Sequence, residues 1–168
     1  MIINNHSITF YSFNVKNSYY TSKNFPLEWQ LMLLSDGSFT QNLNSIIGQN
    51  ININLIRQNL INKNQIIRQV WIEGLHKNKM AFAESYWKKN DIKKSELSYC
   101  KPIGKSMIND ELDISKKIHN INYGYNFFIE KTLQIKHPIF SREYIIWYNN
   151  KPLTTIKEFF SPNLDHIK

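Results

Sequence analysis

The stretch that decides the fold is FSREYIIWYNNKPLTTIKEFFSP, residues 140–162. Two runs rich in β-branched and aromatic residues flank the polar connection NNKP (149–152), whose residue types are typical of turns. This pattern predicts a β-hairpin with the proline at the start of its second strand. Because side chains alternate along a strand, Ile156, Glu158 and Phe160 fall on one face. A carboxylate between two large apolar residues is costly to bury without a partner, so Glu158 is a candidate functional residue.

A second charged residue falls on the apolar face of a predicted strand. In the run QIIRQVWIEGL (65–75), Arg68 shares its face with Val70 and Ile72. A buried ion pair between Arg68 and Glu158 would be structural and weakly stabilising, because desolvation can cost more than the Coulomb attraction returns. Alternatively, both residues line a closed pocket in which Arg68 receives a ligand carboxylate and Glu158 meets a hydroxyl group. Alternation alone leaves both explanations open.

Length and composition indicate one folded domain. The chain has 168 residues, 42% of them hydrophobic and 14% aromatic, which suits a substantial core and excludes a disordered chain. No apolar run approaches the roughly 20 residues that span a bilayer. The N-terminal MIINNHSITFYSF matches neither a secretory signal nor a transit peptide. We therefore expect no stable membrane insertion and a site of action in the compartment of synthesis.

The sequence predicts no metal site and no cofactor. Cys100 is the single cysteine, which excludes an intrachain disulfide and any site built from several cysteines. No catalytic motif surrounds Cys100, and we interpret it as a small, half-buried residue. The five histidines are scattered and lack HxxxH or HExxH spacing.

The charge of the chain suits an anionic partner. A net charge of +8 and a pI of about 9.5 fit nucleic acid, an anionic lipid surface or an acidic small molecule. The abundance of Ile, Asn, Lys, Tyr and Phe, all with A/T-rich codons, also fits a genome of biased composition, such as that of a plastid. The lysines are dispersed, with the densest pairs at 88–89, 93–94 and 116–117, and we interpret them as a solvated surface. Without a basic helix or an RNA-binding aromatic segment, we expect no nucleic-acid partner.

Two helices are predicted after a short strand or ordered arm at residues 6–13. Pro26 suits the first turn of a helix through Leu34, and Asp36-Gly37 ends it. The apolar positions at helical spacing in this helix are Leu27, Leu31 and Leu34. Ser38 is expected to cap the second helix and Gly48 to end it. The buried stripe of the second helix is predicted to be Phe39, Leu43, Ile46 and Ile47.

The rest of the chain alternates mainly between strands and turns. Further strands are predicted at residues 50–58, 65–75, 80–87 and 117–130, before the hairpin of 140–162. Residues 76–79 are predicted as a hairpin loop, and 91–99 and 110–116 as short helical segments. Two helices and about six strands predict an α+β fold with one antiparallel sheet, in a single domain over residues 1–168.

Five segments, in order, resemble the chorismate lyase (chorismate–pyruvate lyase) family and its cyanobacterial and plastid-encoded relatives. They are PLEWQLMLLSDGSFTQNL (26–43), NLIRQ (54–58), IIRQVWI (66–72), KPIGKSM (101–107) and residues 140–162. The resemblance covers roughly residues 26–162. It implies a six-stranded antiparallel sheet flanked by helices, with the ligand enclosed between sheet and flaps. The family removes pyruvate from chorismate to leave 4-hydroxybenzoate, without a metal or organic cofactor.

The resemblance also implies the residues of the site. Family binding positions fall on Phe39 in DGSFT, Arg68 in IIRQVW, Ile103 in KPIG and Glu158 in KEFFSP. Arg68 would hold the ring carboxylate with its planar fork, and Glu158 would lie at the far end of the ring. Phe39 and Ile103 would line the walls. Arg68 and Glu158 are thus the catalytic candidates, with Glu158 either a general acid or only an orienting group.

This chain departs from the family pattern at three places. Gln69 stands where the bacterial enzymes have Glu, and residues 141–143 read Ser-Arg-Glu in place of Gly-Arg-Arg. One extra residue precedes Glu158 in the last strand, which a β-bulge would absorb. Arg57 and Arg142 are further cationic candidates for substrate contact, although each fits a surface or structural role as well.

The functional hypothesis is a chorismate–pyruvate lyase that supplies 4-hydroxybenzoate as a quinone-ring precursor, for plastoquinone in the plastid. The expected location is the plastid stroma if the gene is plastid-encoded, and the cytoplasm otherwise. The alternative is a non-catalytic sensor domain on the same fold that binds an aromatic carboxylate. The presence of both Arg68 and Glu158 favours catalysis, and the lack of a helix-turn-helix segment disfavours a regulator.

Overall fold

The computed structural model describes residues 7–14, 25–48, 50–89, 114–162 and 164. The strands are β1 (Ser7–Asn14), β2 (Asn52–Asn62), β3 (Gln65–Glu73), β4 (Lys79–Lys88), β5 (Ile114–Asn126), β6 (Ile139–Tyr148) and β7 (Lys151–Phe160). The helices are α1 (Leu27–Leu34), α2 (Phe39–Ile47), the short 3-10 helix η3 (Leu75–Lys77) and α5 (Phe127–Leu133). The segments predicted around 91–99 and 101–107, with Cys100 and Ile103, lie outside the described residues.

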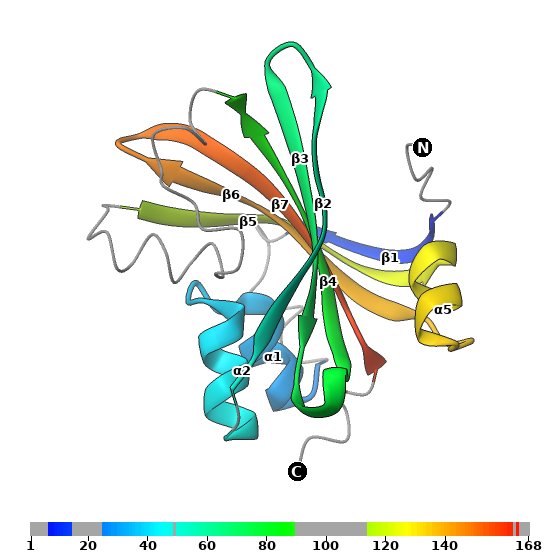
Figure 1. Ribbon diagram of the computed structural model, residues 1–168. Coiled ribbons are helices and arrows are strands. Elements are labelled where there is room, and N and C mark those ends of the chain that lie inside the picture. Colours follow the sequence, from blue (N-terminus) through cyan, green and yellow to red (C-terminus); the bar gives the residue numbers. More distant parts are fainter. Residues whose placement is uncertain (1–6, 15–24, 49, 90–113, 163, 165–168) are drawn as a thin grey trace.

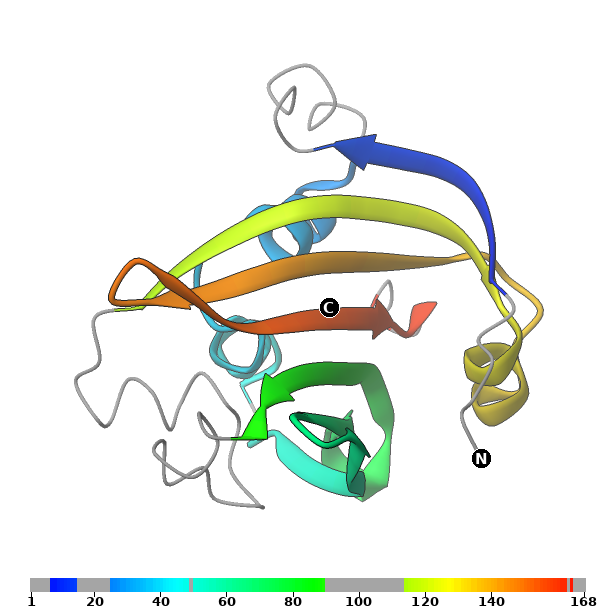
Figure 2. The same cartoon turned by 90° about the horizontal axis from the view of Figure 1, so that it is seen from above.

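All seven strands form one antiparallel sheet in the order β1-β5-β6-β7-β4-β3-β2. The sheet is strongly twisted and curved (Figure 2). The predicted α+β class with a single antiparallel sheet is therefore confirmed. The strand count differs from the expected six, because β1 is paired with β5 at the edge of the sheet and is more than an ordered arm.

The helices cover both faces of the sheet. Figure 1 shows α1 and α2 side by side at one end of the molecule, next to β2 and β4, and α5 on the other side of the molecule. Trp29, Met32 and Leu43 of α1 and α2 belong to the same core cluster as Phe160. Ile129 of α5 belongs to a second cluster with aromatic residues of β3, β4 and β7. Adjacent residues of β7 can both be buried because each face has its own cover.

The hairpin of β6 and β7 forms as predicted, with Asn149 and Asn150 in its tight turn. Their φ angles are 48° and 58°, the left-handed conformation that a two-residue hairpin turn requires and that asparagine tolerates. Tyr148 is paired with Lys151, but further along the ladder the register skips Leu153. A β-bulge is predicted in this strand from the sequence, and the register shift at Leu153 lies between the turn and Glu158, where such a bulge is expected.

Helix α1 forms where predicted but turns a different face inward. Leu27 and Leu31 are exposed at 67% and 50%, whereas Trp29, Met32 and Leu33 are buried. Both sets have helical spacing, so periodicity alone does not distinguish them. The larger ring of Trp29, which packs against Phe140 and Phe160, decides the face. In α2, Phe39 and Leu43 are buried as predicted, but Ile46 is 36% exposed.

The prediction for residues 110–130 is wrong at both ends. Residues 114–116 belong to β5 and are not helical, and residues 127–130 begin α5 and are not a strand. Asn126 caps α5, with its side-chain oxygen accepting a hydrogen bond from the Ile129 N–H at 3.0 Å. The aromatic residues after Asn126 have strand propensity, but burial of α5 against the sheet outweighs it. In the described part of the chain, no helix is long and apolar enough to cross a membrane.

Candidate functional site

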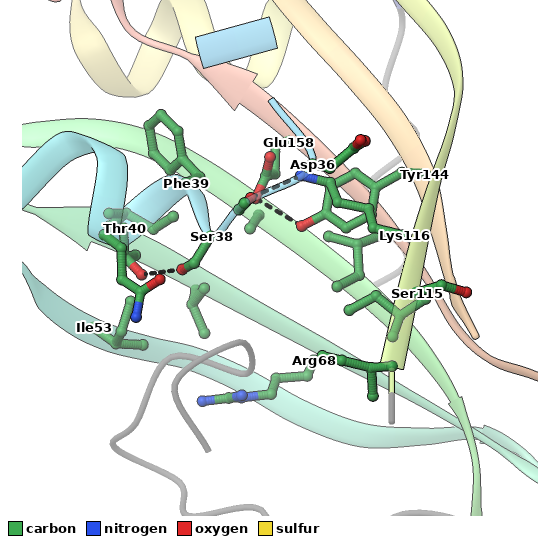
Figure 3. Close-up of a pocket in the computed structure, with 18 residues that line it drawn as sticks. Asp36, Ser38, Phe39, Thr40, Ile53, Arg68, Ser115, Lys116, Tyr144 and Glu158 are labelled. Carbon is green, nitrogen blue, oxygen red and sulfur yellow. Dashed lines mark hydrogen bonds between the residues drawn. The ribbon is translucent and has the colours of Figure 1, made fainter. Parts of the chain in front are cut away.

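A cavity of about 310 Å³ lies between the α1–α2 turn and the sheet face that these helices cover (Figure 3). Its apolar walls include Ile53, Val70, Ile72, Ala83, Ile146 and Ile156. Its ionisable lining groups are Asp36, Arg68, Lys116, Tyr144 and Glu158. Such a volume is near the lower end of small-molecule sites and suits a ligand the size of one substituted ring.

Arg68 and Glu158 both line this cavity, as the alternation of β3 and β7 predicts. Each is only 4% exposed. The guanidinium of Arg68 points away from Glu158, across the cavity (Figure 3). The two residues therefore share a pocket, and the alternative of an ion pair between them is wrong. Arg57, the further cationic candidate on β2, is not among the residues that line the cavity.

The ion partner of Glu158 is Arg142. Arg142 Nε donates a hydrogen bond to Glu158 Oε2 at 2.6 Å. The two residues face each other directly across β6 and β7, which places their side chains on one face of the sheet. Tyr144, two residues further along β6, donates its hydroxyl to Glu158 Oε1 at 3.0 Å. Both oxygens of Glu158 thus accept hydrogen bonds, as an ionised carboxylate does.

Arg142 also connects this pair to α1. Its side chain is fully buried, and Nη1 donates to the carbonyls of Met32 and Leu33 in the last turn of the helix. Those carbonyls lack partners within the helix and carry the negative end of its dipole. The guanidinium carbon also lies 5.8 and 5.6 Å from the ring centroids of Phe39 and Phe160. Arg142 therefore has a structural role behind the pocket wall.

Lys116 on β5 is a pocket residue that the sequence did not reveal. Its Nζ donates to the carbonyls of Ser35 at 3.1 Å and Gly37 at 3.2 Å, and lies 4.4 Å from the Tyr144 ring centroid. The prediction of a solvated pair at 116–117 holds for the exposed Lys117 alone. Ile114, Lys116 and Ile118 lie on one face of β5, and this pattern could have indicated an inward-facing lysine. The sequence predicts a helix for this segment, in which that pattern has no such meaning.

Burial sets the protonation of two pocket residues. It lowers the pKa of Lys116 to about 8, with the like charge of Arg142 adding to the effect and Glu158 opposing it. Burial also raises the pKa of Tyr144 well above its usual value, and the neighbouring Glu158 reinforces the shift. Tyr144 therefore keeps its proton at neutral pH and remains a donor to Glu158.

The helix side of the pocket is built by the start of α2. Phe39, a predicted wall residue, is 4% exposed, lines the cavity and packs edge-on against Phe160 at 5.0 Å between ring centroids. The hydroxyls of Ser38 and Thr40 beside it are 2.9 Å apart. Ile103, the other predicted wall residue, lies outside the described residues. Within the described ranges, no three His, Cys, Asp or Glu side chains are grouped as metal ligands.

The chain resembles known proteins in sequence and in fold. A family model described as chorismate pyruvate-lyase Rv2949c-like matches residues 33–168. Because the match covers most of the sequence, the chain belongs to the Rv2949c-like chorismate pyruvate-lyase family. The ycf21 protein of Antithamnion sp., named as uncharacterized, is 41% identical over 148 residues, 85% of this chain and 83% of that protein. Porphyra purpurea ycf21 is 34% identical over 161 residues, 90% and 91% of the two chains.

Solved structures share the fold at low sequence identity. The effector domain of PhnF from Mycobacterium smegmatis superposes with a TM-score of 0.59 at 7% identity, covering 79% of this chain and 93% of that domain. The C-terminal domain of the histidine utilization repressor from Pseudomonas syringae gives 0.51 at 8% identity, covering 67% and 92%. At these identities the likeness establishes the fold alone.

Proposed function

We propose that this protein is a chorismate–pyruvate lyase whose active site is the cavity on the α1–α2 side of the sheet. The observation that carries the proposal is the placement of Arg68 and Glu158 in one largely apolar pocket, on opposite sides of it. A flat ring with a carboxylate at one end and a hydroxyl at the other fits such a polarity. Membership of the lyase family supports the same choice.

In the proposed reaction, the bond between the ring and the ether oxygen of the enolpyruvyl group breaks. The neighbouring ring carbon loses its proton, the ring becomes aromatic, and the departing enolpyruvate takes up a proton to become pyruvate. The phenol oxygen of 4-hydroxybenzoate is the ring hydroxyl of chorismate. Aromatisation drives the reaction, so holding the substrate in a reactive conformer supplies much of what the site must contribute.

Arg68 is proposed to bind the ring carboxylate, because a guanidinium forms paired hydrogen bonds with a carboxylate. Glu158 is proposed to accept a hydrogen bond from the ring hydroxyl and to receive the proton that leaves the ring. Since Arg142 and Tyr144 both donate to Glu158, this geometry supports an accepting and orienting role over that of a general acid. Phe39 is proposed to provide one wall, and Ile103 to complete the pocket.

A binding module without turnover is the second candidate. It is favoured by the likeness of the fold to the effector domain of PhnF and the C-terminal domain of a repressor. Such a module would keep the carboxylate contact of Arg68 but would need no group to receive a ring proton. Because the pocket holds Glu158 as a buried acceptor, we rank the lyase first.

The test is to mix the purified protein with chorismate and to follow 4-hydroxybenzoate and pyruvate together. We expect equal amounts of both products from the wild type and loss of both in Arg68→Ala. Thermal stabilisation by 4-hydroxybenzoate without product formation would support the binding module. If chorismate gives no product and 4-hydroxybenzoate gives no thermal stabilisation, both candidate functions are refuted.

We further propose that the product feeds a quinone ring, such as that of plastoquinone, and that the protein works in the plastid stroma. The ycf21 relatives from Antithamnion and Porphyra support this placement, since they match the plastid-encoded branch that the sequence resembles. The proposed partners are thus small molecules, chorismate and 4-hydroxybenzoate. Fractionation of the source cells with a specific antibody tests the location, and recovery of the protein outside plastids would contradict it.

A further inference from the structure

The substrate proposed above carries two carboxylates, and its aromatic product carries one. A charge that enters an apolar cavity needs an opposite charge or hydrogen-bond donors to replace water. Arg68 can serve the carboxylate that both molecules share. The charge of Arg142 is already matched by Glu158, so it is committed before any ligand arrives. The carboxylate that leaves with pyruvate therefore needs another cation.

Lys116 has the charge and the surroundings for this task. Glu158 is paired with Arg142, and Lys116 Nζ donates hydrogen bonds to two neutral carbonyls, those of Ser35 and Gly37. An ammonium group has three N–H donors, so these two bonds leave one donor for a ligand. The bond to the Gly37 carbonyl is solvent-exposed, which places the ammonium toward the open end of the cavity.

The position of Lys116 matches the end of the ligand that departs. Its Nζ lies over the Tyr144 ring, and the hydroxyl of Tyr144 bonds to Glu158, so the ammonium is on the Glu158 side. Arg68 lies across the cavity from this group (Figure 3). A ligand that reaches from Arg68 to Glu158 therefore brings its distal substituent next to Lys116. The two carbonyls and the ring hold the ammonium in place before binding, which lowers the ordering cost.

We propose that Lys116 binds the second carboxylate of the substrate, the one that leaves as pyruvate. The subsite rests on the proposed function, and it makes Lys116 the residue that distinguishes a dianionic substrate from its monoanionic product. The expected preference is about 10- to 100-fold in affinity, the range of a charge-assisted hydrogen bond.

The test uses two stable aromatic probes that differ in one charge, 3-(carboxymethoxy)benzoate and 3-methoxybenzoate, with 4-hydroxybenzoate as reference. Calorimetric titration should show that the wild type prefers the dianion about 10- to 100-fold. Lys116→Met should lose that preference and keep its affinity for 4-hydroxybenzoate within about twofold. Lys116→Arg should retain most of the preference, and Lys117→Met on the exposed side of β5 should behave as wild type.

Each outcome separates this subsite from the lyase proposal. An unchanged preference in Lys116→Met, or equal losses for the dianion and 4-hydroxybenzoate, would overturn the assignment. A wild type without preference for the dianion would overturn it as well, even if chorismate is converted. A preference that depends on Lys116 in a protein without lyase activity would support the subsite and refute the proposed function.

If Lys116→Met does not fold, a pH series on the wild type decides. The charged or titratable groups that face Lys116 are Asp36 from the α1–α2 turn, Glu158 from β7, and Arg142 and Tyr144 from β6. As the pH rises through about 8, Lys116 loses its proton and the preference for the dianion should fall. Tyr144 has a raised pKa and stays neutral in this range. A preference that is constant from pH 7 to roughly pH 9.5 would overturn the proposal.

Discussion

Replacing Arg142 by Met should destabilise the protein strongly, although Arg142 is proposed to make no contact with substrate. The change removes the cation that pairs with Glu158 at 2.6 Å and leaves a carboxylate that is 4% exposed without its ion partner. It also removes the donor to the carbonyls of Met32 and Leu33. Breaking one side of a buried ion pair typically costs about 3–5 kcal/mol.

That cost is large against the total stability of a domain, which is about 5–15 kcal/mol. For a chain of this length, each kcal/mol lowers Tm by about 2–4 °C, so Arg142→Met should melt roughly 6–20 °C below wild type. Glu158→Met should have a similar effect, because it leaves the guanidinium of Arg142 buried without its counter-charge. In the double variant, neither charge remains to be paired.

Urea denaturation of the wild type, both single variants and the double variant measures the coupling. We expect the double variant to be less destabilised than the sum of the singles by about 2–3 kcal/mol, the upper part of the range for contacting residues. Lys117→Met, at an exposed position of β5, should stay within about 0.5 kcal/mol of wild type. Additive losses, or a cost below about 1 kcal/mol for Arg142→Met, would refute the view that this pair anchors the site.

Three further changes test other parts of the molecule. Arg68→Ala should weaken 4-hydroxybenzoate binding by at least about 10-fold in a titration, since a charged hydrogen-bonding partner is lost; unchanged affinity would remove Arg68 from the site. Glu158→Gln, assayed below its own melting temperature, should reduce turnover of chorismate more than binding of 4-hydroxybenzoate, and equal losses would limit Glu158 to binding. Gly124→Ala should cost about 1–3 kcal/mol in urea denaturation, because a Cβ there would clash with the Ile8 carbonyl oxygen and force β1 away from β5; wild-type stability would show that β1 shifts freely.

The strands could be predicted because their faces are marked by alternation. Val70 and Ile72 beside Arg68, and Ile156 and Phe160 beside Glu158, gave the inward direction of both charges without any tertiary information. Alternation did not identify the start of β5, because residues 110–116 are predicted as helical. The shared face of Ile114, Lys116 and Ile118 was therefore not recognised. Helix α5 was missed because the residues after Asn126 are aromatic and β-branched, and only burial against the far face of the sheet makes them helical.

The partner of Glu158 was beyond prediction for a different reason. Arg142 was named as a candidate, but its contact depends on which residues of β6 and β7 stand opposite each other. Composition and alternation give the face of each residue, while the pairing depends on the turn and on any irregularity between turn and site. The contact with the end of α1 depends in addition on which face of that helix packs inward, and periodicity pointed to Leu27 and Leu31 instead.

The bulge at Leu153 sets which charge Arg142 meets. Counted evenly from the turn between Tyr148 and Lys151, the residue opposite Arg142 would be Lys157, a like charge. Because Leu153 is skipped in the ladder, the pairing shifts by one residue and Arg142 lies opposite Glu158. The number of residues between the turn and Glu158 thus determines whether Arg142 meets a carboxylate or a like charge. In related chains that lack the extra residue, we expect a compensating change of one residue in the turn or on β6, so that the acid and the base still meet.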